Sequence, residues 1–250
     1  MVAERSTDTT GGTLLGGARR LAAAVGAGAL AGVLVGGIGG RIAMLVLRLT
    51  SDPGLHGSLT DDGFTIGVVS NGTMFLLVLT TILGSLGGVL YLLVRPWLPV
   101  RARAWVFAAL GGVVGGSNII RPGGIDFTLL DPLPLAVAMF VAIPAIGAGV
   151  TSVFAERFLR DGSRFHRSWA ALALLLPVLL ATPILLLRGP TGLVIAVAIG
   201  TAVVAVIANR GPVLARLWRS TPVTWVGRAL LATFGAIAAV RLVSDVVEIL

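Results

Sequence analysis

Long apolar stretches alternate along this chain with short connections that hold most of its charge. A helix rises about 1.5 Å per residue, so about 20 apolar residues are enough to cross the hydrocarbon core of a bilayer. The pattern therefore predicts an all-α, polytopic transmembrane helix bundle with six or seven spans. The seven candidate stretches are residues 21–49, 72–94, 104–120, 134–154, 169–187, 191–208 and 229–250.

The number of spans depends on the last stretch. Residues 72–94, 134–154 and 169–187 carry no charge and are long enough to cross the membrane. In residues 229–250, by contrast, Arg241 follows about a dozen apolar residues, a length that also suits a helix lying in the membrane interface. The sequence alone is therefore compatible with a bundle of six spans and with one of seven.

Composition narrows the chemistry. Hydrophobic residues make up 56% of the chain and charged residues 12%, and the mean hydropathy is +0.99, outside the usual range of a soluble domain. There is no Cys, every basic residue is Arg, and there are 2 His, which excludes disulfides, thiolate metal sites and a Schiff-base lysine. We therefore expect no metal, no cofactor and no nucleic-acid partner, and we attribute the sequence pI of 11.7 to membrane orientation.

Arginine is distributed unevenly between alternate connections. If the N-terminus is cytoplasmic, that side receives fourteen of the 19 basic residues, in agreement with the positive-inside rule. We therefore expect a multi-pass protein of a cell membrane, interpreted as a bacterial inner membrane, with its N-terminus inside. The fourteen residues are Arg5, Arg19, Arg20, Arg95, Arg101, Arg103, Arg157, Arg160, Arg164, Arg167, Arg210, Arg216, Arg219 and Arg228.

Two cytoplasmic segments differ from ordinary connections. Residues 1–20 are rich in Gly, Thr and Ser without apolar periodicity, which predicts a flexible tail ahead of a transmembrane domain at 21–250. Residues 213–225 place Arg216 and Arg219 among apolar residues. This segment is either an ordinary loop or an amphipathic stretch that attracts anionic lipids to the inner leaflet.

Glycine recurs at helical spacing in two of the predicted spans. Close backbone approach drives helix association in lipid, and glycine permits it. The stripes therefore predict helix packing, and we expect the first and third spans to pair, although the partner could also be a second copy or another membrane protein. The glycines are Gly28, Gly32, Gly36 and Gly40 in the first span, with Gly111 and Gly115 in the third.

Charged residues gather toward the predicted outer side. Arg41 and Arg48 are two helical turns apart, and Arg241 and Asp245 are one turn apart. One interpretation is an outward-facing pocket in which arginines bind an anionic or carboxylate ligand and acids orient them. The other is that the charges merely neutralise one another. The set is completed by Asp61, Asp62, Arg121 and Asp126.

These features favour a non-enzymatic protein, acting as an accessory or ligand-binding component through its outer polar face. A small-solute transporter or channel is the alternative. Coupled carriers usually place an Asp, Glu or His near the membrane midplane. The predicted spans 72–94, 134–154, 169–187 and 191–208 contain no charged residue, which disfavours coupled transport. An intramembrane enzyme that uses Arg and Asp on a lipid-linked substrate is least favoured. An intramembrane serine protease is disfavoured because no His accompanies Ser85 and Ser117 in the glycine-rich helices.

The orientation predicts the outcome of reporter fusions. A reporter inserted in connection 157–167 should be active only in its cytoplasmic form, because Arg157, Arg160, Arg164 and Arg167 hold this connection inside. A fusion in connection 121–131 is the control and should report the opposite side. An external signal from 157–167 would contradict the predicted topology.

Overall fold

The elements of the described chain are all helical. The structure is a computed structural model, and it describes residues 5–51, 71–124, 127, 131–160, 163, 218 and 220–250. The first helix runs without a break through three parts, α1 (Arg5–Ala31), the π-helical segment η1 (Gly32–Gly39) and α2 (Gly40–Thr50). It is followed by α3 (Asn71–Val94), α4 (Arg103–Ile119), α6 (Leu133–Phe158) and α10 (Thr221–Ile249).

Among the described residues, four helices are long and apolar enough to cross a membrane. This confirms a helical architecture of the membrane type, but the count is lower than the six or seven spans predicted. The predicted spans 169–187 and 191–208 lie outside the described residues, and α4 is a shorter helix of 17 residues. The four candidate spans are Gly16–Thr50, Met74–Val94, Leu133–Phe158 and Thr221–Ile249.

The first and last helices can be compared with what the sequence predicted for them. Arg241 does not end the last helix, because α10 continues unbroken to Ile249. At the other end, α1 begins at Arg5, so the backbone of residues 5–20 is helical and continuous with the first candidate span. The flexibility expected for residues 1–20 stays a prediction.

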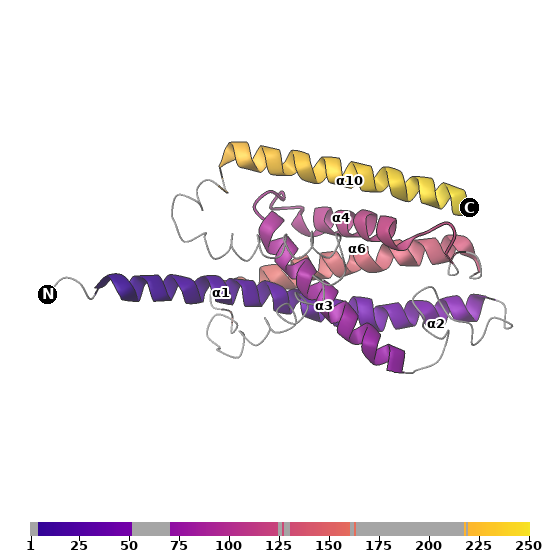
Figure 1. Ribbon diagram of the computed structural model, residues 1–250, viewed down its shortest axis with the longest axis horizontal. Helices are drawn as coiled ribbons and strands as arrows, with labels where there is room; N and C mark the ends of the chain where they lie inside the picture. The colour runs from indigo at the N-terminus through magenta and orange to yellow at the C-terminus, as the bar shows by residue number, and fades with distance from the viewer. Residues whose placement is uncertain are drawn as a thin grey trace.

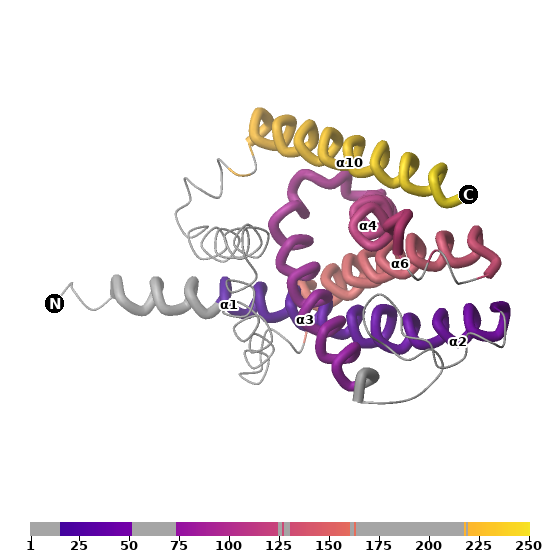
Figure 2. The backbone as a smooth tube through the Cα atoms, turned by 45° about the vertical axis from the view of Figure 1, so that its right-hand side comes forward, coloured from indigo at the N-terminus to yellow at the C-terminus, as the bar shows by residue number. Residues whose placement is uncertain are grey.

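Successive helices run in alternating directions between two ends of the molecule (Figure 1). One end gathers the α3–α4 turn, the last turn of α6 and the start of α10; we call it the first end. At the opposite end, here the second end, Ser51 after α2 meets the start of α6. The backbone N–H of Asp131 donates to Ser51 Oγ at 2.9 Å. In Figure 2 the first helix, α6 and α10 run across the view, and α4 is seen nearly end-on between α6 and α10.

The glycine stripe of the first helix lies against α3. A methyl group placed on Gly28 would overlap the carbonyl oxygen of Gly84 and would lie 2.8 Å from the nitrogen of Gly88. Gly32 meets Thr80 and Gly84 in the same way, and a methyl on Gly36 would lie 2.9 Å from Thr80 Cβ. The two helices therefore touch backbone to backbone, and α3 crosses the first helix obliquely (Figure 1).

The expected pairing of the first span with the third is wrong. The glycines of α4 instead face α6, the helix that follows it. A methyl on Gly111 would lie 2.8 Å from the Pro144 carbonyl oxygen, and Gly115 leaves room for the Pro144 ring. Gly40 has nothing within 4 Å of the position where its Cβ would stand.

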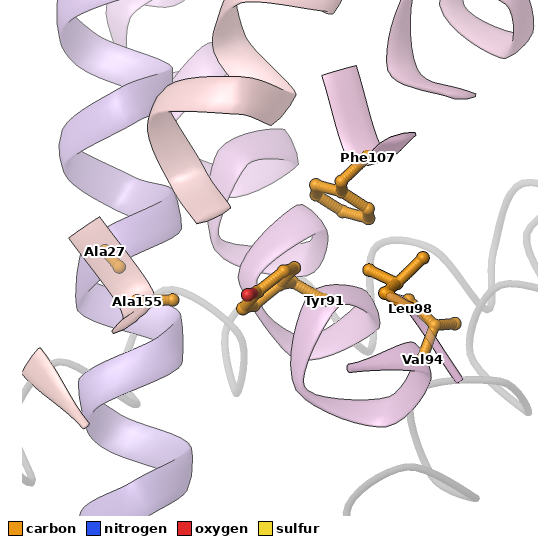
Figure 3. Packing of buried hydrophobic residues seen from close by; sticks show 6 residues of the cluster. All are labelled: Ala27, Tyr91, Val94, Leu98, Phe107 and Ala155. Carbon is orange, nitrogen blue, oxygen red and sulfur yellow. The ribbon is translucent and has the colours of Figure 1, made fainter. Parts of the chain in front are cut away.

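The C-terminal half of α1 is buried on nearly every side. Leu21 to Gly28 are all buried, although the segment consists mainly of Ala and Gly. Small side chains let neighbouring helices approach all faces of one helix, so a segment with little side-chain volume can still be enclosed. Figure 3 shows Ala27 in the adjoining core cluster, together with Tyr91, Val94, Leu98, Phe107 and Ala155.

The contact between α1 and α3 predicts the effect of single methyl groups. Gly84→Ala should lower the free energy of unfolding by about 1–3 kcal/mol, because its methyl would meet the Gly32 Cα at 2.8 Å, and backbone yields less readily than a side chain. The measurement is the Tm of the purified protein in detergent. Gly87→Ala on the same helix is the matched control, since its methyl meets nothing within 4 Å and Ala favours a helix. An equal Tm for the two variants would contradict the close contact.

Candidate functional site

The residues predicted for the outer polar face lie at the second end where they are described. Arg48 is in the last turn of α2. Arg41 is half-buried two turns earlier on the same helix. Its Nε and Nη2 atoms are shielded from solvent. Asp61, Asp62 and Asp126 lie outside the described residues.

The structure brings one subset of these residues together. Ile120, Phe127 and Val137 form a buried cluster against which Leu242 and Val246 of α10 pack. Their sequence neighbours Arg121, Arg241 and Asp245 therefore lie in one region, over the end of α4 and the C-terminal half of α10. The arginines of α2 lie apart from this region, because α4 and α6 separate α2 from α10 in both views (Figures 1 and 2).

Among the residues that the structure describes here, no ion pair joins the charges of this region. Arg121 and Arg241 are exposed, and neither forms an ion pair within the part of the chain that the structure describes. Arg241 and Asp245 are one turn apart on α10, yet no ion pair joins them. Among the described residues, the two guanidinium groups are thus exposed and without a carboxylate partner.

A different polar cluster lies at the first end, centred on the Glu156 carboxylate of α6. Arg95, just after α3, forms a two-pronged pair with it, through Nε to Oε1 at 2.7 Å and Nη2 to Oε2 at 2.9 Å. Arg103 at the start of α4 donates from Nη1 to Oε1 at 3.2 Å. The hydroxyl of Tyr91 in α3 donates to the same oxygen at 2.7 Å. One carboxylate thus connects α3, α4 and α6.

The surroundings of this cluster strengthen its hydrogen bonds. Tyr91 is fully buried and its ring packs edge-on against Phe107, with 5.0 Å between ring centroids. The side chains of Arg95 and Glu156 are 35% and 30% exposed, so water screens the pair only in part. The hydrogen bonds to Glu156 raise the pKa of the Arg95 guanidinium above its ordinary value. The cluster is therefore a structural tie between helix ends.

Sequence reasoning missed this cluster. It assigned Arg95 and Arg103 to membrane orientation alone and gave Glu156 no role. Two features of the sequence could have indicated it. Glu156 follows an uncharged apolar stretch on the arginine-rich side, and Tyr91 is the single tyrosine of the chain. An acid against the end of a span is costly without a partner, so it predicts a nearby base.

Tryptophans tie α10 to the same end of the molecule. Trp97 in the α3–α4 turn lies on Gly227, with its Cε2 2.6 Å from the position where a Cβ would stand. Its ring packs against Trp218 with 5.0 Å between centroids. The Trp97 carbonyl accepts a hydrogen bond from Arg228 Nε at 2.9 Å. Gly227 is thus a position where only a hydrogen atom fits beneath an indole.

Neither end shows the groups of a metal centre. In the described residues, no three His, Cys, Asp or Glu side chains are placed to hold a metal ion. The expectation of a protein without metal or cofactor stays a prediction. Comparisons with known protein families, curated proteins and solved structures found no match to this sequence.

The Glu156 cluster predicts a large effect of one isosteric change. Glu156→Gln should lower the free energy of unfolding by about 2 kcal/mol, since hydrogen bonds to a charged group contribute about 1.5–3 kcal/mol and two arginines lose their counter-charge. The Tm in detergent measures this. Glu248→Gln, at an exposed position without an ion pair in the described chain, is the matched control and should leave the Tm unchanged. An unchanged Tm for Glu156→Gln would show that the cluster contributes nothing.

Proposed function

We propose that this chain is a multi-pass protein of a bacterial inner membrane, with six or seven spans and a cytoplasmic N-terminus. It acts without catalysis, as an accessory or ligand-binding component that presents an arginine-rich polar face on the outer side. Under this orientation the first end, with Glu156, is cytoplasmic, and the second end, with Arg121 and Arg241, faces outward.

The span count is supported by where the described chain stops and resumes. α6 finishes at the first end, where Glu156 meets Arg95, and α10 starts at the same end, where Arg228 meets Trp97. A chain that leaves and re-enters at one side of a bilayer crosses it an even number of times. The two apolar stretches 169–187 and 191–208 satisfy that requirement.

The observation that carries the binding role is the pair of exposed arginines at the second end. At the first end, two arginines are bound to Glu156 and hold helices together. At the second end, Arg121 and Arg241 are exposed and form no ion pair within the described chain. Guanidinium groups recognise carboxylate and phosphate through parallel hydrogen bonds, so an anionic or carboxylate-bearing ligand suits this end.

Close packing favours binding over passage of a solute. α1 and α3 touch through Gly28, Gly32 and Gly84, and α4 and α6 touch through Gly111. These contacts leave no room for side chains, let alone for a water-filled path, between the members of either pair. The second candidate function is transport of a small solute by a route along other helices. A partner membrane protein or a second copy of this chain would bind the lipid-facing surface.

The outer face predicts binding of carboxylate anions. Citrate and glutamate should be screened for a rise in the Tm of the purified protein, since a ligand at about 100 times its Kd adds ~2.7 kcal/mol to the free energy of unfolding. The double variant Arg121→Gln/Arg241→Gln should lose the rise. Arg101→Gln/Arg160→Gln, which removes two exposed arginines from the first end, is the charge-matched control and should keep it.

Two results would redirect this proposal. A Tm rise of equal size in the double variant would place the ligand elsewhere. Uptake of the labelled anion into proteoliposomes, absent from protein-free vesicles, would replace the accessory role with transport. A Tm rise without uptake would support ligand binding alone.

A further inference from the structure

Arg228 differs from the other exposed arginines because the protein fixes its side chain. Nε donates to the Trp97 carbonyl at 2.9 Å, and the guanidinium carbon lies 5.5 Å from the centre of the Trp225 ring. A hydrogen bond on one edge and a ring beside one face hold the guanidinium plane in place. Its two Nη groups remain as donors at the surface.

No carboxylate of the described residues pairs with this fixed charge. Arg228 forms no ion pair within the described residues. At this end of the described chain, the acid is Glu156, and its oxygens are bonded to Arg95, Arg103 and Tyr91. An arginine that is oriented but not neutralised is arranged for an anion from outside the chain.

A second donor nearby also lacks an acceptor. The indole N–H of Trp97, the residue whose carbonyl holds Arg228, is shielded from solvent and has no hydrogen-bond partner in the described chain. Trp225 is 64% exposed. Such an exposed indole ring suits the level of the lipid headgroups, where its apolar body and polar N–H are both accommodated. An exposed and oriented guanidinium therefore coincides with an aromatic side chain suited to the membrane interface.

The helix that carries Arg228 also exposes apolar side chains over most of its length. Leu230, Phe234 and Val240 of α10 are each more than half exposed, at 61%, 58% and 70%. Acyl chains would cover such side chains while a headgroup meets the start of the helix. A free phosphate ion would gain nothing from this surface, so a lipid is the favoured source of the anion.

We propose that Arg228, oriented by Trp97 and Trp225, binds the phosphate group of an anionic phospholipid in the cytoplasmic leaflet. The guanidinium Nη groups donate two parallel hydrogen bonds to phosphate oxygens, and the acyl chains lie along α10. The leaflet assignment rests on the proposed N-in orientation. The phosphate contact itself does not depend on that orientation.

The test measures lipid binding to the full-length protein after delipidation in detergent. Native mass spectrometry and the Tm would be recorded with phosphatidylglycerol, with phosphatidylcholine and with inorganic phosphate. We expect phosphatidylglycerol to bind and to raise the Tm most. Phosphatidylcholine should bind more weakly, because its choline cation offsets the phosphate charge, and inorganic phosphate should have little effect because it has no acyl chains. Arg228→Gln should weaken phosphatidylglycerol binding about tenfold or more, since hydrogen bonds to charged groups are lost.

Two further variants separate a site from general charge attraction. Arg228→Lys keeps the charge but loses the planar pair of donors, so it should bind more weakly than the wild type. Arg160→Gln removes one exposed positive charge from the end of α6 and should bind as the wild type does. If Arg228→Gln fails to fold, the lysine variant and Trp225→Leu, which removes the supporting ring, carry the comparison.

Each outcome decides the proposal. Equal binding by wild type and Arg228→Gln, or equal losses in Arg228→Gln and Arg160→Gln, would overturn it in favour of diffuse attraction. A similar Tm rise with inorganic phosphate would overturn the lipid as the source of the anion. None of these outcomes bears on the carboxylate test, which uses Arg121 and Arg241 at the opposite end, so the two proposals fail separately.

Discussion

Contact between the backbones of α1 and α3 is the constraint on which the other helix positions depend. In a lipid environment helices gain little from burying apolar surface, so association relies on close contact over many atoms. Gly28 and Gly32 on one helix meet Gly84 and Gly88 on the other without intervening side chains. Once these two helices touch, α6 can cover both, and the Ala-rich C-terminal half of α1 becomes the centre of the structure.

The Glu156 cluster fixes one end of this arrangement. Glycine contacts are non-directional and would tolerate small shifts of helices along one another. Hydrogen bonds from Tyr91, Arg95 and Arg103 to one carboxylate have defined lengths and directions, so they set the relative height of α3, α4 and α6. The combination explains how a chain of small and apolar residues reaches a single packing.

The arginines of the described chain fall into two groups, those with a structural role and those proposed to bind anions. Arginines bound to Glu156 hold helices, whereas Arg228, Arg121 and Arg241 are exposed and form no ion pair within the described chain. Arg228 is held by Trp97 and Trp225 at one end, and the other two lie beside α4 and α10 at the opposite end. The anion-binding surfaces proposed at both ends agree with the proposed accessory role.

The sequence by itself determined the helical class and the apolar segments, because hydropathy and helical spacing are properties of neighbouring residues. It also drew attention to Gly28, Gly32, Gly111 and Gly115 as positions for close packing, although it chose the wrong partners. The matching small residues Thr80, Gly84 and Gly88 recur every four residues in α3 and were the missed signal.

Only the tertiary structure decided which helices meet. Tyr91 and Glu156 are 65 residues apart in sequence, and Arg228 and Trp97 are 131 apart. Whether such residues meet depends on the directions of several helices at once, and local spacing carries no information about those directions. Pairing in lipid is decided by the shapes of two surfaces together, so one glycine stripe cannot specify the helix that it will touch.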